Sequence, residues 1–281
     1  MALKSILVHL DGTDAAKSRL RLAVDLARRH RAHLIGLYVV DVMLPIMAAA
    51  DAASGAVLAD LLERMRTDAL EEASGVEAAF REALRRDDLA GEWRCVEGAA
   101  PELVALHARY ADLAMLGQAN PDDGQPSASA IVEATLFGSG RPVLVIPYAG
   151  TFETLGRRVV VGWNASRESA RAVNDALPLL AGAASVVVTA VNPRLGLEGH
   201  GEEPGADIAL HLARHGLKVE VEHTLAPEID AGDLLLNRMA ELSADLLVVG
   251  AYGHSRLRET ILGGVTRTLL KQMTVPVLMS H

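Results

Sequence analysis

The sequence predicts an α/β protein made of two tandem domains, each a parallel β-sheet with helices on both of its faces. Two observations lead to this prediction. Short β-branched, apolar runs alternate with longer helical stretches along the whole chain, a pattern typical of parallel strands joined by crossover helices. In addition, the second half of the chain repeats the first in order and spacing, which indicates two copies of one domain.

The repeat rests on three pairs of similar segments. SILVHLDGTDAAKSRLRLAVDLA, which starts at Ser5, is similar to RVVVGWNASRESARAVNDALPLL, which starts at Arg158. ADLAMLG returns later as ADLLVVG, and RPVLVIP returns as VPVLMSH. We therefore expect domains over residues 1–149 and 156–281, joined by a linker within YAGTFETLGRR.

Five strands are expected in each domain, because five short apolar runs occur in each half. In the first half they are SILVHL, HLIGLYVV, EWRCVE, DLAMLG and PVLVIP. In the second half they are RVVVGW, SVVVTAV, KVEVEHTL, DLLVVG and PVLMS.

Helical stretches separate these strands, and several begin with recognisable signals. Thr13 or Asp14 can cap the first helix, because their side-chain oxygens accept from free backbone N–H groups. Pro101 suits the first turn of another helix, where its missing N–H costs nothing. The expected helices are Asp14–His30, Leu58–Arg86, Pro101–Tyr110, Arg167–Ala181, Ala206–His215 and Asp233–Leu242.

Composition narrows the class of protein. Hydrophobic residues make up 50% of the 281 residues and aromatic residues 3%, so Ala, Leu and Val must fill the core. A net charge of −9 without a basic block argues against nucleic acid as a partner. We expect a soluble, cytoplasmic protein with no membrane span, because no signal peptide and no run of ~18–20 apolar residues is evident. The single cysteine, Cys95, is expected to be a packed core thiol in a strand.

A group of four glycines after ADLLVV raises the question of function. Gly250 and Gly253 permit tight, left-handed turns. Gly263 and Gly264 stand side by side before VTRTLLKQM, a candidate helix. A bare helix N-terminus at the carboxyl edge of a parallel sheet offers unpaired N–H groups and the positive end of the helix dipole to a phosphate. The alternative is that Gly250 and Gly253 only turn the chain and that the pair Gly263 and Gly264 only allows close helix packing.

These glycines, together with HLDGTDAAKSRL and VPVLMSH, resemble the universal stress protein family, twice over and along nearly the whole chain. The resemblance implies a Rossmann-like, five-stranded parallel sheet of order 3-2-1-4-5 in each domain. It also implies pairing through the last strand, supplied in part by the two halves of one chain. The segment VPVLMSH would be an exposed edge unless paired, so a homodimer through the terminal strands is expected as well.

The resemblance implies a site for ATP, with Mg²⁺, in the second domain, and at most one nucleotide per chain. The family's Asp after the first strand is replaced by Asn164, and the backbone near the adenine maps onto Val191. The family's Ser or Thr is replaced by Gly264, and the nearby Thr266 is a candidate to supply the missing hydroxyl. The nucleotide-binding residues predicted in this way are Asn164, Val191, Gly250, Gly253, His254, Arg256, Gly263, Gly264, Val265 and Thr266.

The first domain keeps only part of this site. Asp11, Val40 and Gly117 occupy the corresponding positions after its strands, but an asparagine replaces the second glycine and no glycine pair opens the next helix. Asp122 and Asp123 would also repel a triphosphate. A degenerate site at Asp11, Val40 and Gly117 is therefore expected.

No catalytic site and no metal site is predicted. His211 and His215 have the i, i+4 spacing that can bind zinc, but no third ligand is evident, so they are expected to face solvent. His254 lacks an orienting carboxylate for a role as a general base. The segment Val42–Leu62 is rich in Met and Ala, and it either contacts a partner or packs on its own domain.

The favoured hypothesis is a non-catalytic stress-response protein that binds ATP or a related adenine nucleotide in its second domain. The first alternative is a nucleotide-independent interaction scaffold that uses Val42–Leu62 and the terminal strands. The second alternative is a slow nucleotide hydrolase, which the lack of an assembled acid/base set disfavours.

Overall fold

The computed structural model describes residues 2–42, 55–122, 127–193, 203–251 and 264–281. All ten expected strands form. They are β1 (Ser5–His9), β2 (His33–Val40), β3 (Gly91–Glu97), β4 (Leu113–Gly117), β5 (Val143–Ile146), β6 (Arg158–Gly162), β7 (Ser185–Val191), β8 (Val219–Thr224), β9 (Leu246–Gly250) and β10 (Val277–Ser280).

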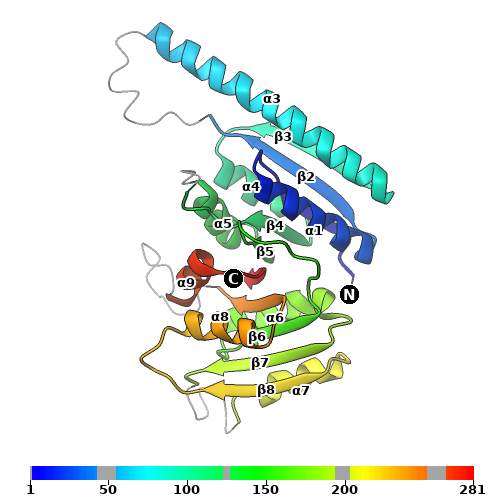
Figure 1. Ribbon diagram of the computed structural model, residues 1–281, viewed down its shortest axis with the longest axis vertical. Coiled ribbons are helices and arrows are strands. Elements are labelled where there is room, and N and C mark those ends of the chain that lie inside the picture. The colour runs from blue at the N-terminus through cyan, green and yellow to red at the C-terminus, as the bar shows by residue number, and fades with distance from the viewer. Residues whose placement is uncertain (1, 43–54, 123–126, 194–202, 252–263) are drawn as a thin grey trace.

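One continuous sheet of ten strands runs through the molecule in the order β3-β2-β1-β4-β5-β10-β9-β6-β7-β8 (Figure 1). Each half has the order 3-2-1-4-5 that the resemblance implied, and all pairings within a half are parallel. The halves meet where β10 pairs antiparallel with β5, so that Leu278 lies opposite Leu144. The pairing between the two halves through their last strands that the resemblance implied is therefore present. The last strand was expected to be an exposed edge unless paired. Because β10 has a neighbour on each side, the argument for a homodimer through that strand no longer applies.

The six expected helices form, and the first matches its expected bounds at both ends. Thr13 is its N-cap and accepts a hydrogen bond from the backbone N–H of Ala16. The helices are α1 (Asp14–His30), α3 (Gly55–Asp87), α4 (Ala100–Ala108), α5 (Ser127–Gly138), α6 (Arg167–Leu180), α7 (Ala206–Arg214), α8 (Ala231–Glu241) and α9 (Gly264–Gln272).

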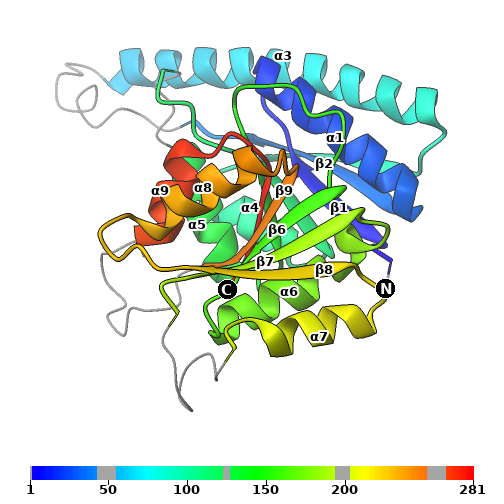
Figure 2. The same cartoon turned by 60° about the horizontal axis from the view of Figure 1, so that its bottom comes forward.

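The helices cover the sheet in two layers. Helices α1, α3, α6 and α7 pack on one face, and α4, α5, α8 and α9 pack on the other. Figure 2 shows α4, α5, α8 and α9 gathered on the same side. The two apolar layers consist almost entirely of aliphatic side chains, as the composition predicted. None of the helices in the described ranges has the length and apolar character needed to cross a membrane.

One carboxylate in each half holds the start of the first strand, and it comes from the repeated ADL motif. Asp112 Oδ2 accepts hydrogen bonds from the backbone N–H groups of Lys4 at 2.7 Å and Ser5 at 3.0 Å. Its counterpart Asp245 accepts from the backbone N–H groups of Arg157 and Arg158. The repeat in sequence is therefore also a repeat of tertiary contacts.

The edges of the sheet within the described residues are β3 and β8. Cys95 lies in β3 and is exposed, so the expectation of a packed core thiol is wrong. The strand was recognised correctly, but its position at the edge leaves it covered less well than the central strands. The sequence pattern of a strand does not reveal whether a neighbour lies on each side.

We predict that Asp112→Ala and Asp245→Ala each lower the free energy of unfolding by about 1–2 kcal/mol, because each leaves strand-start N–H groups without their acceptor. Urea unfolding followed by circular dichroism measures the change. Asp68→Ala, an exposed position on α3, is the control and should leave stability unchanged. Wild-type stability in both variants would show that these carboxylates are not anchors.

Candidate functional site

Three predicted site residues of the second domain lie at the same edge of the sheet. Asn164, Val191 and Gly250 follow or close β6, β7 and β9, and β6 lies between β9 and β7 in the parallel sheet. The carboxyl ends of parallel strands form the edge at which ligands bind in this class of sheet. The remaining predicted loop residues lie outside the described residues: Gly253, His254, Arg256 and Gly263.

Helix α9 begins at Gly264, as the glycine pair predicted. Gly264 is exposed, Val265 is half-buried, and Thr266 is 3% exposed. The open first turn of the helix therefore presents bare backbone to solvent at Gly264. The hydroxyl of Thr266 belongs to a buried side chain, so Thr266 is a poor replacement for the hydroxyl that Gly264 lacks.

A carboxylate that the sequence analysis did not single out lies beside this helix start. Asp230 is the N-cap of α8, where its Oδ1 accepts from the backbone N–H of Gly232 at 2.8 Å. Its other oxygen, Oδ2, lies 3.5 Å from the position that a Cβ on Gly264 would occupy. Asp230 therefore places a negative charge at the end of α9 where an anion would bind. Its position just before an expected helix, where Asp is a favoured N-cap, was a signal that went unused. Its proximity to α9 arises only from folding.

The role of Gly250 differs from the predicted one. Its backbone does not adopt positive φ, so no left-handed turn requires glycine there. Instead, a Cβ on Gly250 would lie 2.6 Å from the carbonyl carbon of Glu168 and even closer to the backbone nitrogen of Ser169. The first turn of α6 thus packs directly on Gly250, a role that the sequence did not predict for this residue.

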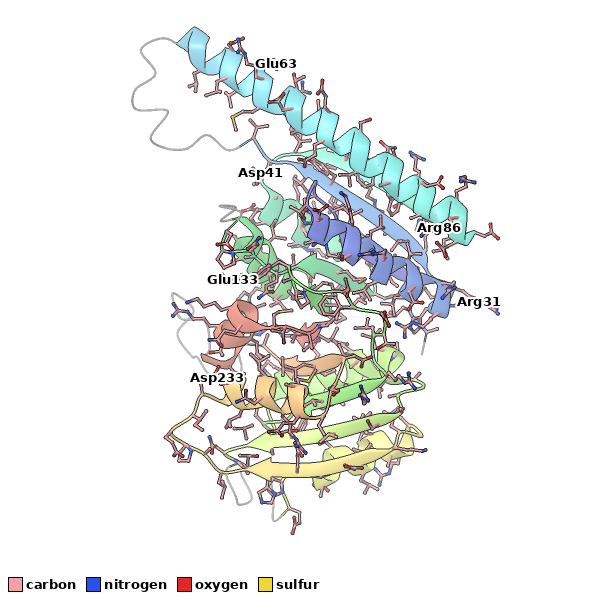
Figure 3. The ribbon with its side chains drawn as sticks, in the orientation of Figure 1. Arg31, Asp41, Glu63, Arg86, Glu133 and Asp233 are labelled. Atoms are coloured by element: carbon pink, nitrogen blue, oxygen red, sulfur yellow. The ribbon has the colours of Figure 1, made fainter. Side chains whose placement is uncertain are left out.

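Side-chain amides and carboxylates organise the loops at the edge. Asn164 is exposed, and its Oδ1 accepts from the backbone N–H of Ser166 at 3.2 Å. Asn192, directly after Val191, clamps Ala226 by accepting from its N–H at 2.7 Å and donating to its carbonyl at 3.2 Å. In the first domain, Asp41 at the end of β2 (Figure 3) accepts from the backbone N–H that opens α4, at 3.1 Å.

The corresponding edge of the first domain contains a buried arginine. Arg19 is 2% exposed and reaches from α1 to donate to Asp11 Oδ2 at 2.8 Å and to the carbonyl of His9 at 2.7 Å. Its Nη1 lies so close to Gly117 that a Cβ there would collide with it. The equivalent positions in the second domain hold Asn164 and Ala172, so both members of the ion pair differ together.

This cluster shifts the pKa values of its members. Burial and, to a smaller extent, the positive charge of Arg19 lower the pKa of His9 from 6.5 to about 4, against the opposing effect of the Asp11 charge. Burial by itself would raise the pKa of Asp11, but Arg19 and the hydrogen bonds from Thr13 outweigh it and hold the pKa below its usual value. At neutral pH the cluster therefore consists of a neutral His9 ring beside the ion pair of Asp11 and Arg19.

The other candidates offer little for binding or catalysis. His215 is exposed and His211 is half-buried, with ring centroids 4.9 Å apart, so the expectation of two solvent-facing rings holds for His215 alone. Within the described ranges, no group of three or more His, Cys, Asp or Glu side chains could hold a metal ion. Partial burial and the carboxylates of Glu77 and Glu97 raise the pKa of Cys95, which disfavours a reactive thiolate. Residues 43–54 of the predicted contact surface lie outside the described residues.

The comparisons with known proteins agree on one family. The sequence model described as the Universal stress protein family matches residues 2–117 and 156–281. A universal stress protein of Synechocystis sp. is 34% identical over 67 residues, which is 24% of this chain and 22% of that protein. The match therefore spans about a fifth of the length of this curated relative.

Solved structures share the fold over the whole chain. A universal stress protein from Archaeoglobus fulgidus superimposes with a TM-score of 0.75 at 15% identity, over 98% of this chain and 95% of that one. A putative universal stress protein from Pseudomonas aeruginosa has a TM-score of 0.57 at 15% identity, over 99% of this chain and 93% of that one. At such identities the likeness establishes the tandem fold and nothing more.

We predict that His9→Gln removes a component of the pH dependence of stability. The folded-state pKa of about 4 lies below the unfolded value of 6.5. The neutral ring therefore stabilises the fold above pH 6.5, and this contribution, up to about 3 kcal/mol, is lost as pH falls through that window. Urea unfolding at pH 7.0 and 4.5 should show a smaller loss for His9→Gln than for wild type. If His9→Gln loses as much free energy of unfolding as wild type between these pH values, a group other than His9 is responsible. His223→Gln, at an exposed position, is the control.

We further predict that alanine is tolerated at Gly264 but not at Gly250. Gly250→Ala should lower the free energy of unfolding by about 2 kcal/mol or more, because its Cβ would overlap the backbone of α6. Gly264→Ala should leave stability within about 0.5 kcal/mol, because Asp230 at 3.5 Å is an ordinary contact. Thermal unfolding of both variants measures the difference. Equal effects would contradict the assignment of Gly250 to packing.

Proposed function

The chain belongs to the universal stress protein family, and from this premise we propose that it is a cytoplasmic, non-catalytic stress-response protein whose second domain binds ATP or a related adenine nucleotide. The observation that carries the proposal is the start of α9. Gly264 opens this helix with exposed backbone at the edge of the sheet where Asn164, Val191 and Gly250 also lie. Free N–H groups and the helix dipole suit a phosphate at such a position.

Asp230 indicates that a divalent cation would accompany the nucleotide. A carboxylate and a phosphate at the same helix start repel each other, and the repulsion grows as water is excluded. Mg²⁺ is commonly held by one or two carboxylates together with substrate phosphates. Because Asp230 Oδ2 lies close to Gly264, it is the described residue best placed to share a Mg²⁺ ion with the phosphates.

The first domain does not offer an equivalent site. The Arg19 guanidinium lies across Gly117 and neutralises Asp11, so the position of the family's acidic residue is occupied by an internal ion pair. This is a second reason, beyond the missing glycine pair, to assign at most one nucleotide to each chain.

Binding without catalysis is the simplest role for the residues at the second edge. Asn164 replaces an acidic residue, and an amide cannot serve as a general base. Asp230 is engaged as a helix cap. Nucleotide bound at ~100 times its Kd would add about 2.7 kcal/mol to the stability of the folded state, which is sufficient to bias one conformation over another.

We predict that the protein binds ATP in equilibrium dialysis and that Mg²⁺ strengthens the binding. Asp230→Asn keeps an oxygen acceptor for Gly232 but removes the charge. It should tighten Mg²⁺-free ATP binding by about tenfold, through loss of repulsion, and should reduce the gain from Mg²⁺. Asp207→Asn, an exposed position in the same domain, should behave as wild type.

The proposal fails if millimolar ATP, with or without Mg²⁺, neither binds in dialysis nor raises the melting temperature of the protein. If ATP binds but Asp230→Asn behaves as wild type in both metal conditions, the nucleotide does not occupy the start of α9. Phosphate release at a rate that depends on Gly264 would contradict the non-catalytic part of the proposal.

A further inference from the structure

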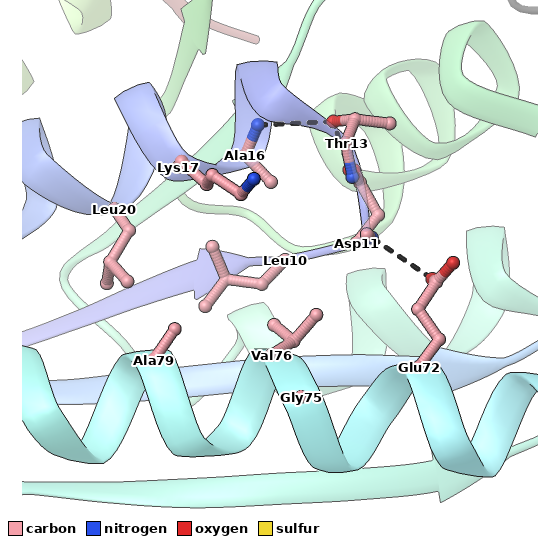
Figure 4. Close-up of a pocket in the computed structure, with 11 residues that line it drawn as sticks. Leu10, Asp11, Thr13, Ala16, Lys17, Leu20, Glu72, Gly75, Val76 and Ala79 are labelled. Carbon is pink, nitrogen blue, oxygen red and sulfur yellow. Dashed lines mark hydrogen bonds between the residues drawn. The ribbon is translucent and has the colours of Figure 1, made fainter.

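A cavity of about 310 Å³ lies between α1 and α3 in the first domain (Figure 4). This volume is at the lower end of the range of small-molecule sites. Helix α1 forms one wall, helix α3 the other, and the loop after β1 closes one end. The lining residues are Leu10, Asp11, Gly12, Thr13, Ala16, Lys17, Leu20, Glu72, Gly75, Val76 and Ala79.

The interior of the cavity is apolar. Leu10, Ala16 and Leu20 have 1%, 3% and 8% of their surface exposed and belong to the main core cluster. Val76 packs against the same cluster from α3. Figure 4 shows these side chains facing one another across the gap between the two helices. An apolar body of matching size would bury its surface here without disturbing the core.

A glycine keeps the α3 wall open. Gly75 lies in the middle of a helix of 33 residues, where glycine weakens a helix relative to alanine. No packing contact accounts for it, because a Cβ built on Gly75 has no other atom within 4 Å. By contrast, a Cβ on Gly12, at the closed end, would collide with the side chain of Glu72. Gly75 is exposed, so the space beside it lies on the open side of the cavity, and no close helix packing requires glycine there.

The polar end of the cavity carries an uncompensated negative charge. The carboxylate of Glu72 accepts hydrogen bonds from the backbone N–H of Gly12 at 3.0 Å and from the Tyr38 hydroxyl at 2.7 Å. Both donors are neutral, and no salt bridge involves Glu72 within the described part of the chain.

The other charges at the cavity are already paired. Asp11 is paired with Arg19 at 2.8 Å. Lys17, whose side chain is 72% exposed, is paired with Asp14 at 2.7 Å. The cavity as a whole therefore presents an apolar interior with one net negative charge at its end.

We propose that this cavity is a binding site for a small primary amine carried on an apolar or aromatic body. The ammonium group donates to the Glu72 carboxylate, which retains lone pairs beyond those used by Gly12 and Tyr38. The apolar body lies against Leu10, Leu20 and Val76. The site is in the first domain, on the helical face between α1 and α3, and is separate from the start of α9 that carries the nucleotide proposal.

The test uses three probes with the same phenyl body and different head groups: 2-phenylethylamine, 2-phenylethanol and 3-phenylpropanoate. Binding to the full chain is measured by isothermal titration calorimetry, and its location by amide chemical-shift changes. We expect the amine to bind at least about tenfold more tightly than the alcohol, because its hydrogen bond is charge-assisted. We expect the carboxylate to bind most weakly. The largest shift changes should be at Gly12, Thr13, Gly75 and Val76.

Two pairs of variants test whether binding depends on the charge of Glu72 and on the space beside Gly75. Glu72→Gln keeps the acceptor for Gly12 but removes the charge, and should bring the affinity of the amine down to that of the alcohol. Glu71→Gln, its exposed neighbour, should bind as wild type. Gly75→Leu should fill the cavity and weaken all probes by about tenfold or more, while the protein remains folded because leucine favours the helix. Gly75→Ala should retain binding.

Binding of the alcohol or the carboxylate as tightly as the amine would overturn the proposal. So would wild-type amine affinity in Glu72→Gln or in Gly75→Leu, or shift changes confined to residues outside the cavity. Absence of binding by all three probes would likewise reject it. These outcomes are independent of ATP binding, which is measured in the other domain.

Discussion

The structure depends on the antiparallel pairing of β5 with β10. Each domain by itself would end in a short, largely apolar strand with a free edge, and such edges recruit other chains. Pairing the two last strands inside one chain covers both edges and makes one sheet of ten strands. Side-chain contacts between the two domains accompany this pairing. Gln118 donates to the carbonyl of Leu270 at 3.0 Å, and the Phe137 ring meets the His281 ring edge-on with centroids 4.8 Å apart.

The join links the two domains at the helix that carries the proposed nucleotide site. Gln118 is buried and follows β4 of the first domain, yet its side chain holds the last turn of α9 in the second. The other end of α9 starts at Gly264. Helix α9 therefore contacts the first domain at its last turn and lies beside Asp230 at its first residue.

The two halves have diverged through coupled replacements. Asp11 and Arg19 form a buried ion pair in the first domain, where an isolated buried charge would be costly. The second domain has Asn164 and Ala172 at these positions, and neither needs a partner. The first domain therefore has an internal ion pair at this edge and a cavity beside it, while the second has an exposed Asn164 at the corresponding position. Duplication allowed this because each half retains its own sheet and its own strand anchors, Asp112 and Asp245.

The sequence by itself determined the strands, the helices, the repeat and the strand order, because periodicity and turn signals act over a few residues and the resemblance extends over both halves. Only the tertiary structure decided what each residue contacts. Cys95 is exposed because β3 is an edge, Gly250 is glycine because α6 packs on it, and Asp230 lies beside Gly264 because the starts of α8 and α9 are close together. The sequence likewise did not indicate that Arg19 lies against Gly117 or that Glu72 lies against Gly12. These contacts join residues far apart in the chain, and the local pattern around each residue is the same whether or not its partner is present.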